Sequence, residues 1–517
     1  MVQLAAAAPS DSSITVYSLG RTERIVPVVQ GDRRVDLGSF EVGGYGVELE
    51  GSTTAFDVLA SPFDRPRYGF VAALDEQVDI AGVTSNFRRL HLNLAQFYDW
   101  AYRHSTLLPP EDRYLDPLGQ ERTLSTVNAM AEALSAVGTA PLGYSAVYAV
   151  GHDELDTWGA SVIHRSDGEA YRLGENFLVL VDPAEPRWLE HYLGQLEAVL
   201  ETTKLSGFHL DQYGWPKFAQ REDGTVVDLA ESFVTLLAAI RERMPAVAMM
   251  FNNVNDFPTW ATATSPQDAS YIEVWPPHSG LQDLADLASR TRALRPEHPP
   301  ILSAYLSCYN DDERRANTAA ELVMATAFSH GASHLLLGEH SSVLTGPYYP
   351  DNHVLTEQSL SGFVPWYDFA VRYGDLLYDP KLVDVTETYT GGINGDVVFS
   401  GLPVSTKADA GTIWTRVVRT GEGLVLHLIN LTDQASTEWD EGKNDLTVVS
   451  GLTVTLSLVG SDAVLGFASV EEPTMVDLVS HATSASEQHD ALSAAQAGAV
   501  FAVPPFRAWA VVLVPLS

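Results

Sequence analysis

Two carboxylates stand at the ends of short apolar segments of the kind that forms buried parallel strands. Asp211 ends one such segment and Glu273 ends another, and a tryptophan lies close after each acid, at Trp215 and Trp275. Cleavage of a glycosidic bond needs two carboxyl groups, because one attacks carbon or activates water while the other protonates the leaving oxygen. Aromatic rings beside such a pair suit the apolar face of a sugar. The pattern therefore predicts glycoside chemistry.

The neighbours of the two acids predict different roles for them. Asp211 lies among polar residues, His209 and Gln212, where a carboxylate stays ionised and can attack carbon. Glu273 lies between two aliphatic residues and close to Trp275, and an apolar setting raises a carboxyl pKa. We predict Asp211 as nucleophile and Glu273 as acid/base of a retaining enzyme, with carboxyl groups about 5 to 5.5 Å apart. The alternative is that both acids cap helices or join buried ion pairs.

Polar and aromatic side chains also follow the other apolar segments. Aromatic faces pack against pyranose rings, and planar polar groups bind the sugar hydroxyls. Glu339, with His340 beside it, competes for a catalytic role, but we predict that it contacts a sugar hydroxyl or supports a residue that does. The predicted substrate contacts are Tyr98, Asp99, Trp100, Tyr144, Tyr148, His209, Gln212, Trp215, Asn252, Asn253, Trp275, Glu339 and His340.

The spacing of the apolar segments indicates the fold that positions these groups. From Arg89 to Leu377 short apolar strands alternate with amphipathic stretches of helical length, which is typical of a closed (β/α)8 TIM barrel. In such a barrel the functional groups lie at the carboxyl ends of the strands. The predicted strands are residues 90–95, 140–145, 177–181, 207–210, 247–251, 270–274, 301–305 and 334–337.

Patterns typical of antiparallel sheets precede and follow the barrel. Before it, short segments rich in Val, Tyr and Phe are broken by Gly, Asp and Pro, and after it the helical period disappears and apolar residues alternate with polar ones. We predict three domains: a small N-terminal β-sandwich-like domain at residues 1–80, a catalytic barrel at residues 81–382 and a C-terminal antiparallel β-sandwich at residues 383–517.

The composition excludes several classes of partner. The 517 residues carry a formal net charge of -36, which repels nucleic acid and anionic membranes and leaves a neutral or cationic ligand. No apolar run could span a membrane and no signal peptide is visible, so we expect a cytoplasmic protein or a secreted one whose signal has been removed. Cys308 is the single cysteine and the histidines lack metal-ligand spacing, so we predict no disulfide, metal or cofactor.

Several ordered motifs resemble glycoside hydrolase family 66, the family of the dextranases and cycloisomaltooligosaccharide glucanotransferases. The likeness covers the chain from Leu90 to Leu377. Its strongest parts are His91 to His104, Phe251 to Asn255, Tyr271 to Trp275, and Gly346 to Pro350 followed by Trp366 to Phe369. The resemblance implies a barrel between two β-sandwiches and retaining cleavage of α-1,6-glucan, with Asp211 at the position of the family nucleophile and Glu273 at that of its acid/base.

The resemblance also bears on the reaction. Cyclising members carry a carbohydrate-binding module inserted late in the barrel, and residues 304–333 leave room for one helix only. This favours hydrolysis of dextran or isomaltooligosaccharides over cyclisation. Leu210 and Gln212 stand where the family usually has glycine and threonine, which is a departure next to the nucleophile. The alternatives are a glucanotransferase acting on α-1,6-glucan and a non-catalytic carbohydrate-binding protein, and the oligomeric state is open.

Overall fold

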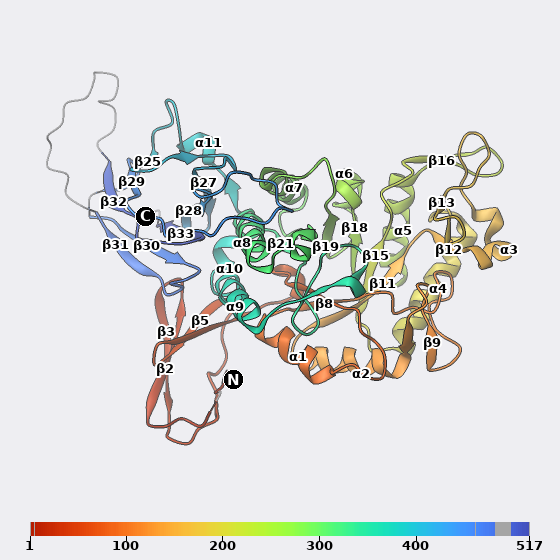
Figure 1. Ribbon diagram of the computed structural model, residues 1–517, viewed down its shortest axis with the longest axis horizontal. Coiled ribbons are helices and arrows are strands. Elements are labelled where there is room, and N and C mark those ends of the chain that lie inside the picture. The colour runs from red at the N-terminus through yellow and green to blue at the C-terminus, as the bar shows by residue number, and fades with distance from the viewer. Residues whose placement is uncertain (1, 5, 461, 481–497, 516–517) are drawn as a thin grey trace.

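A closed barrel of parallel strands lies at the centre of the computed structural model, which describes residues 2–4, 6–460, 462–480 and 498–515 (Figure 1). Within these residues the largest sheet has eight strands, whose order in the sheet follows their order along the chain. The Glu339 N–H, just after the last strand, donates to the Phe70 carbonyl on the first strand at 2.8 Å, so the two edges meet. The barrel strands are β7 (Tyr68–Val71), β8 (Leu94–Phe97), β11 (Ala140–Ala146), β15 (Gly207–Asp211), β18 (Ala248–Asn252), β19 (Ala269–Glu273), β20 (Ile301–Ser303) and β21 (Ser333–His334).

Helices surround the sheet as a ring in Figure 1, because each buries one apolar face against the strands. They are α1 (Ile80–Arg89), α2 (Leu124–Ser135), α4 (Pro186–Thr202), α5 (Leu229–Arg243), α6 (Thr259–Thr262), α7 (Leu281–Leu294), α8 (Glu313–Ser329), α9 (Glu357–Arg372) and α10 (Gly374–Leu377). Side chains cap their first turns, as Thr123 does for α2, Asp228 for α5 and Asp312 for α8. Between β18 and β19 the chain makes only a 3-10 turn and the single helical turn of α6.

Shorter elements extend the loops that follow the barrel strands. Three hairpins are β9 (Arg113–Leu115) with β10 (Glu121–Thr123), β16 (Phe218–Gln220) with β17 (Val226–Asp228), and β22 (Ser342–Val343) with β23 (His353–Val354). A lobe between β11 and β15 contains the sheet β12 (Ala149–Gly151), β14 (Leu178–Leu180) and β13 (Arg172–Leu173), together with α3 (Leu155–Trp158). The 3-10 turns are η1 (Pro62–Asp64), η2 (His152–Glu154), η3 (Gly159–Ser161), η4 (Val254–Asp256), η5 (Ser307–Asn310) and η6 (Tyr349–Asp351).

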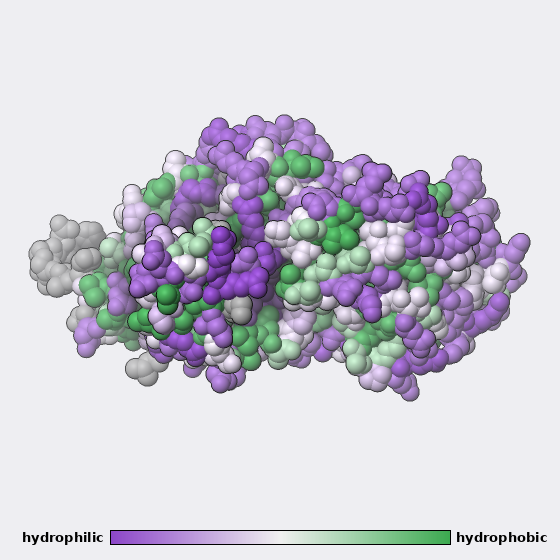
Figure 2. Space-filling model, turned by 90° about the horizontal axis from the view of Figure 1, so that it is seen from below, coloured by the Kyte–Doolittle hydropathy of each residue, from purple (hydrophilic) through white to green (hydrophobic). Residues whose placement is uncertain are grey.

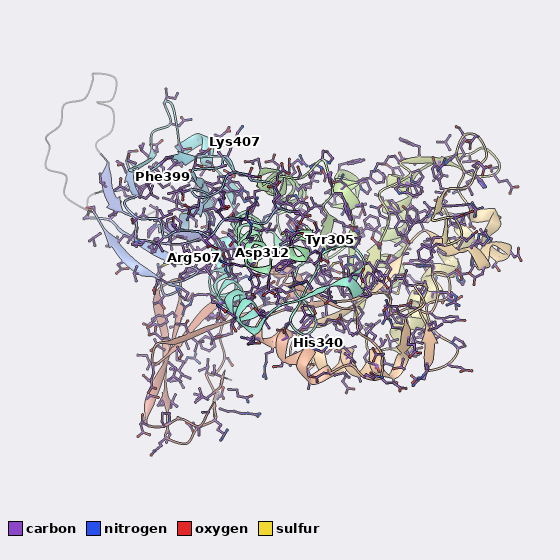
Figure 3. The ribbon with its side chains drawn as sticks, viewed as in Figure 1. Tyr305, Asp312, His340, Phe399, Lys407 and Arg507 are labelled. Carbon is purple, nitrogen blue, oxygen red and sulfur yellow. The ribbon has the colours of Figure 1, made fainter. Side chains whose placement is uncertain are left out.

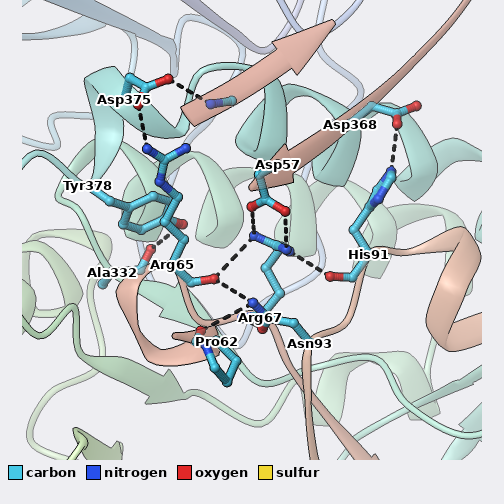
Figure 4. Close-up of polar contacts among 11 residues, drawn as sticks. Asp57, Pro62, Arg65, Arg67, His91, Asn93, Ala332, Asp368, Asp375 and Tyr378 are labelled. Atoms are coloured by element: carbon cyan, nitrogen blue, oxygen red, sulfur yellow. Dashed lines mark hydrogen bonds and ion pairs between the residues drawn. The ribbon is translucent and has the colours of Figure 1, made fainter. Parts of the chain in front are cut away.

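The N-terminal residues form an antiparallel sheet that is tied to the barrel by ion pairs. In sheet order its strands are β3 (Arg21–Val28), β2 (Ser12–Ser18), β5 (Gly43–Leu49) and β6 (Ser52–Val58), and β1 (Val2–Gln3) pairs with β4 (Arg34–Val35). Figure 4 shows Arg67 forming two hydrogen bonds with Asp57 of β6 and, beside it, Arg65 pairing with Asp375 of α10. Both guanidinium groups are almost fully buried. Paired charges of this kind fix the orientation of the N-terminal sheet on the barrel.

Two further sheets follow the barrel and share one apolar core. Among the described residues the larger contains, in order, β24 (Val383–Asp384), β27 (Ile413–Thr420), β28 (Gly423–Asn430), β33 (Trp509–Val514), β30 (Val464–Ser469) and β31 (Val476–Val479), with β26 (Val404–Ser405) beside β27. The smaller contains β25 (Val397–Ser400), β29 (Thr453–Leu456) and β32 (Ala499–Ala502). Leu426 and Val512 of the first sheet pack in one cluster with Val454 and Phe501 of the second. A one-turn helix, α11 (Thr386–Tyr389), precedes β25.

The structure confirms the predicted barrel but corrects one of its strands. Residues 177–181 contain β14, which pairs within the lobe, and the missing barrel strand is β7, inside the range predicted for the N-terminal domain. β14 is apolar because the lobe buries it, and β7 has only four residues, so it resembles the β-rich sequence before it. The boundaries after residues 80 and 382 stay predictions.

Candidate active site

A cavity of about 410 Å³ lies at the carboxyl ends of the barrel strands, where barrel enzymes hold their substrates. It unites both predicted catalytic acids with most of the predicted sugar contacts. The predicted residues that line it are Tyr98, Asp99, Tyr144, His209, Asp211, Gln212, Trp215, Asn252, Glu273 and Trp275.

One amide group joins the two predicted catalytic acids. Asn252 donates from Nδ2 to Asp211 Oδ1 at 2.7 Å and to Glu273 Oε2 at 3.0 Å. The Glu273 N–H donates to Asn252 Oδ1 at 3.3 Å, which fixes the orientation of the amide. The two bridged oxygens, Asp211 Oδ1 and Glu273 Oε2, are therefore separated by less than the sum of the 2.7 and 3.0 Å distances. This separation is below the roughly 6.5 to 9.5 Å that leaves room for water between the acids of inverting enzymes.

The register of the barrel strands produces this arrangement. Leu210 on β15 pairs with Phe251 on β18, so the next residues along, Asp211 and Asn252, end their strands side by side. Asn252 in turn pairs with Tyr271 on β19, and Glu273 lies two residues further on. Alternate residues of a strand share one face, so Glu273 faces the same side as Tyr271, which also lines the cavity.

Asp211 accepts a hydrogen bond at each of its carboxylate oxygens. The Tyr144 hydroxyl on β11 donates to Oδ2 at 2.7 Å, and Asn252 occupies Oδ1. Burial raises the pKa of Asp211, whereas the hydrogen bonds from Tyr144 and Asn252 lower it. Donors aimed at the ionised form keep a carboxylate available for attack.

Glu273 has stronger reasons to hold a proton. Burial raises its pKa, and the negative charge of Asp211 raises it further, while hydrogen bonds from Asn252, Tyr305 and Trp275 lower it. Two carboxylates at this separation resist ionising together, so the pair retains one proton over part of the pH range. Because the charge of Asp211 raises the pKa of Glu273, whereas the Tyr144 and Asn252 hydrogen bonds lower the pKa of Asp211, we assign that proton to Glu273.

Aromatic side chains make up much of the cavity wall. Trp275 and Tyr305 meet with ring centroids 5.8 Å apart beside Glu273, and Tyr98 stacks on Tyr349 at 4.3 Å. Trp215, on the opposite loop, meets Tyr171 of the lobe at 6.0 Å. Such rings present flat apolar faces together with hydroxyl groups, which suits a sugar ring.

His209 lies beneath the acids on the same face of β15 as Asp211. Its Nδ1 is 3.0 Å from the Tyr68 hydroxyl, and its ring stacks between those of Tyr68 and Tyr144. Burial lowers the pKa of His209 to about 3, so the imidazole is neutral at physiological pH. A neutral ring can exchange hydrogen bonds with a sugar hydroxyl and adds no charge to the site.

Asp99 brings a third carboxyl group to the cavity. Burial and the negative charge of Asp116 raise the pKa of Asp99 to about 7. The backbone at Asp99 has a φ of 38°, a left-handed conformation that is uncommon for a residue other than glycine. Arg122 holds it there by donating from Nε to the Asp99 carbonyl at 3.3 Å. Strained backbone of this kind is frequent at binding sites.

Three predicted contacts lie behind the cavity wall, because their side chains turn into the packing between strand and helix. Trp100, Tyr148 and Asn253 are fully buried and do not line the cavity. Trp100 Nε1 donates to the Tyr144 carbonyl at 3.1 Å, and the Tyr148 hydroxyl donates to the Trp215 carbonyl at 2.7 Å. Asn253 donates to the Tyr271 carbonyl at 3.1 Å. As placed, each positions a lining residue and does not face a ligand.

Glu339 and His340 also lie outside the cavity. Glu339 Oε2 accepts from the Ala72 and Ala73 N–H groups at 2.8 and 2.7 Å, and the residue is 4% exposed. It therefore joins the last barrel strand to the first. His340 is exposed, and in Figure 3 it lies toward α1, apart from the cavity residue Tyr305.

The cavity has further lining residues that were not among the predicted contacts. They are Gln96, His104, Leu118, Leu173, Phe177, Leu178, Tyr213, Val254, Tyr271, Tyr305, Pro347, Tyr348 and Tyr349. Tyr305 follows β20 and carries the same strand-end signal as the predicted residues. Gln96 and Tyr271 lie on the inward faces of their strands. The lobe residues Leu173 and Phe177 carry no such signal, because their sheet is not part of the barrel.

The described ranges contain neither a cluster of metal ligands nor a helix suited to crossing a membrane. No group of three or more His, Cys, Asp or Glu side chains is placed there to hold a metal ion. Over the same ranges, none of the helices combines the length and the apolar character that crossing a membrane requires. Cys308 is buried and carries a free thiol.

Comparison with known proteins points to one family. A family model described as glycosyl hydrolase family 66 matches residues 42–513. A cycloisomaltooligosaccharide glucanotransferase from Niallia circulans is 20% identical over 582 residues, which cover 82% of this chain and 60% of that protein. A second protein of the same description and organism is 24% identical over 332 residues, covering 57% of this chain and 34% of that protein. The chain thus spans at most about 60% of the length of these relatives.

A solved structure shares the fold over almost the whole chain. It is a Paenibacillus sp. cycloisomaltooligosaccharide glucanotransferase complexed with cycloisomaltoheptaose, with a TM-score of 0.84. The superposition covers 99% of this chain and 96% of that chain at 16% sequence identity. At this identity the likeness establishes the shared fold, including the barrel.

Proposed function

The chain belongs to glycosyl hydrolase family 66, and from that premise we propose that it cleaves α-1,6-glucosidic linkages of dextran or isomaltooligosaccharides with retention of configuration. The observation that carries the proposal is the Asn252 amide, which donates to Asp211 and to Glu273 at once. An amide that bridges two acids holds them at the separation of a nucleophile and a proton donor on opposite sides of one glycosidic bond.

In the first step Asp211 attacks the anomeric carbon while Glu273 gives its proton to the leaving oxygen. A bond from carbon to the Asp211 oxygen forms as the glycosidic bond breaks. The ester that results carries no charge, so one cause of the raised pKa of Glu273 disappears. Glu273 is then a carboxylate of lower pKa and serves as the base that takes a proton from the acceptor.

Asn252 and Tyr144 support this reaction by donating hydrogen bonds to the nucleophile, Asp211. Both donate to Asp211 when it is ionised, and one of them also reaches Glu273. The donors are fixed by the barrel before substrate binds, so no reorganisation is needed as charge moves between the acids.

The aromatic-lined cavity suits an uncharged glucan. The net charge of -36 repels anionic polymers, and the cavity rings supply stacking surfaces. Both curated relatives are named cycloisomaltooligosaccharide glucanotransferases, and we extend the α-1,6-glucan class to this chain on that basis.

Either water or a sugar hydroxyl can attack the covalent intermediate, and the comparisons favour a sugar hydroxyl as the acceptor. The sequence predicted hydrolysis, whereas the curated relatives and the similar solved structure are glucanotransferases. We therefore propose transfer to a sugar hydroxyl as the second step, with hydrolysis as the competing reaction. The segment between β20 and β21 holds only η5 and α8 in the described structure, which supports linear products over cyclic ones.

The test pairs two acid variants with an exposed aspartate as control. Asp211→Ala and Glu273→Gln should each lose at least about a thousandfold in turnover of isomaltooligosaccharides, and Asp223→Ala, at a fully exposed aspartate, should not. Azide, a small external nucleophile, should restore cleavage by Asp211→Ala. Mass analysis of the wild-type products separates transfer, which lengthens chains, from hydrolysis. Near wild-type turnover by either acid variant would refute the proposed function.

A further inference from the structure

The ten tryptophans of the chain, all within the described residues, divide sharply by exposure. Seven are buried, Trp215 and Trp275 are half-buried in the cavity wall, and Trp260 on α6 is 62% exposed. The three that are not buried follow the consecutive barrel strands β15, β18 and β19. Barrel enzymes use these loops for substrates. Trp260 therefore lies on the segment that leaves the cavity end of β18.

The segment that carries Trp260 is fastened to both cavity tryptophans. Asn255 donates from Nδ2 to the Pro276 carbonyl at 3.1 Å and accepts from the Trp275 N–H at 3.2 Å. On the other side, the Lys217 ammonium lies 3.5 Å from the centre of the Phe257 ring. Lys217 is two residues after Trp215, which joins the segment to that loop.

Phe257 supports the exposed indole from below. Its ring is buried and meets Trp260 at a centroid distance of 5.6 Å. Asn255 and Asp256 have φ values of 52° and 68°, and this left-handed pair turns the chain before α6. Trp260 is thus a supported ring with a free face, in a turn held at several points.

We propose that Trp260 is a platform for a distant glucose unit of a long glucan chain whose cleaved bond lies in the cavity. The inference rests on the proposed function and adds a binding site outside the cavity. Val254 lines the cavity and precedes Trp260 by six residues, so the two Cα atoms are at most about 20 Å apart. A chain of a few sugars leaving the cavity can cover that distance.

The surroundings of Trp260 fit a sugar better than a protein partner. The other exposed large apolar residues in the neighbouring loops are Phe218 and Val226 on the β16 and β17 hairpin. So small a set falls short of the roughly 1,000 Å² that a stable protein interface requires. Asp256 and Arg290 form a 3.0 Å ion pair beside α6, and their planar groups can bind sugar hydroxyls.

The deciding experiment compares long and short substrates. Trp260→Ala should raise KM for dextran about three- to tenfold, as expected for loss of one aromatic contact, and leave KM and kcat for isomaltotriose within about twofold. Trp260→Tyr should recover most of the loss. Ile393→Ala, at a fully exposed residue far along the chain, is the control. Equal effects on both substrates, or no effect on either, would overturn the proposal.

A binding assay separates this inference from the proposed function. With Glu273→Gln, dextran should shift the tryptophan emission to shorter wavelength more than isomaltotriose does, because only the longer ligand reaches Trp260. In Glu273→Gln with Trp260→Phe the difference should vanish. A difference that persists overturns the platform even where the acid variants are inactive. Acid variants that keep their turnover refute the proposed function, whatever the emission shows.

Discussion

The hydroxyl of Tyr144 lies 2.7 Å from Asp211 Oδ2, so the residue assigned as nucleophile accepts a hydrogen bond from a tyrosine that lies three barrel strands away from Glu273. Tyr144 is on β11 and Asp211 on β15, and the Ala146–Asp211 pairing of these strands places the tyrosine beside the acid. Asp211 thus accepts from Tyr144 on one side and from Asn252, which also donates to Glu273, on the other.

Tyr144→Phe tests this tuning without changing the shape of the cavity. Loss of a hydrogen bond to a charged group costs about 1.5 to 3 kcal/mol, so kcat/KM should fall about 10- to 100-fold. Since that bond lowers the pKa of Asp211, the acid limb of the pH profile should move to higher pH. An unchanged acid limb would show that Tyr144 does not act through Asp211. Tyr17→Phe, in the N-terminal sheet, is the control.

Asn252→Ala should be more damaging than Tyr144→Phe because it removes a donor from both acids. It also leaves the Glu273 N–H without its acceptor. We expect kcat/KM to fall at least about a hundredfold while the circular dichroism spectrum is unchanged. Asn252→Asp places a third carboxyl group, and with it a second negative charge, between the acids, so its activity should be lower still at pH 7 and recover partly as the pH falls. Full activity of either variant would exclude the bridging role.

The pH profile of kcat/KM should be bell-shaped, with one limb determined by each of the two acids. Asp211 must be ionised, so activity is lost as the pH falls through its pKa, and Glu273 must be protonated, so activity is lost as the pH rises through its pKa. Burial raises both values, and the charge of Asp211 raises that of Glu273 further. Both limbs should therefore lie above the ordinary carboxyl values of 3.8 and 4.5. An alkaline limb near 4.5 would contradict the assignment of Glu273.

Glu339 should matter for stability more than for chemistry. Glu339→Ala leaves the Ala72 and Ala73 N–H groups without a partner where β21 meets β7, at a cost of about 1 to 3 kcal/mol for each group. Glu339→Gln retains an acceptor and should cost less. Urea unfolding should show this order, with kcat/KM within about threefold of wild type at 25 °C. A large loss of kcat with unchanged stability would restore Glu339 to the list of substrate contacts.

The position of the proposed catalytic pair could be predicted because barrel chemistry leaves a local signal in the sequence. Asp211 and Glu273 each end an apolar strand, and that holds whichever strands surround them. The predicted number of barrel strands was correct, but their assignment was not, since β14 was taken as a barrel strand and β7 was missed. The two errors cancel, so Asp211 still lies on the fourth strand and Glu273 on the sixth.

The rest of the site depends on the directions in which side chains point, and the sequence does not predict these directions. Trp100 and Asn253 stand at strand ends as Trp275 and Asn252 do, yet they point into the packing around the barrel. Phe177 reaches the cavity from a lobe whose sheet has no fixed relation to the barrel strands. The sequence also does not predict how polar and apolar residues are grouped on the surface. Charged residues are spread along the whole chain, whereas Figure 2 shows a mostly hydrophilic face with small separate apolar patches.

Trapping the covalent intermediate tests the central claim most directly. A glucosyl fluoride with a second fluorine on the sugar ring, which forms the intermediate faster than the intermediate breaks down, should inactivate the enzyme. Mass analysis of the digested protein should place one fluoroglucosyl group on Asp211. Glu273→Gln, which keeps the nucleophile, should still be labelled there because fluoride leaves without a proton. A label on Asp99 or another carboxylate, or turnover with no label at all, would contradict the assignment of Asp211 as the nucleophile.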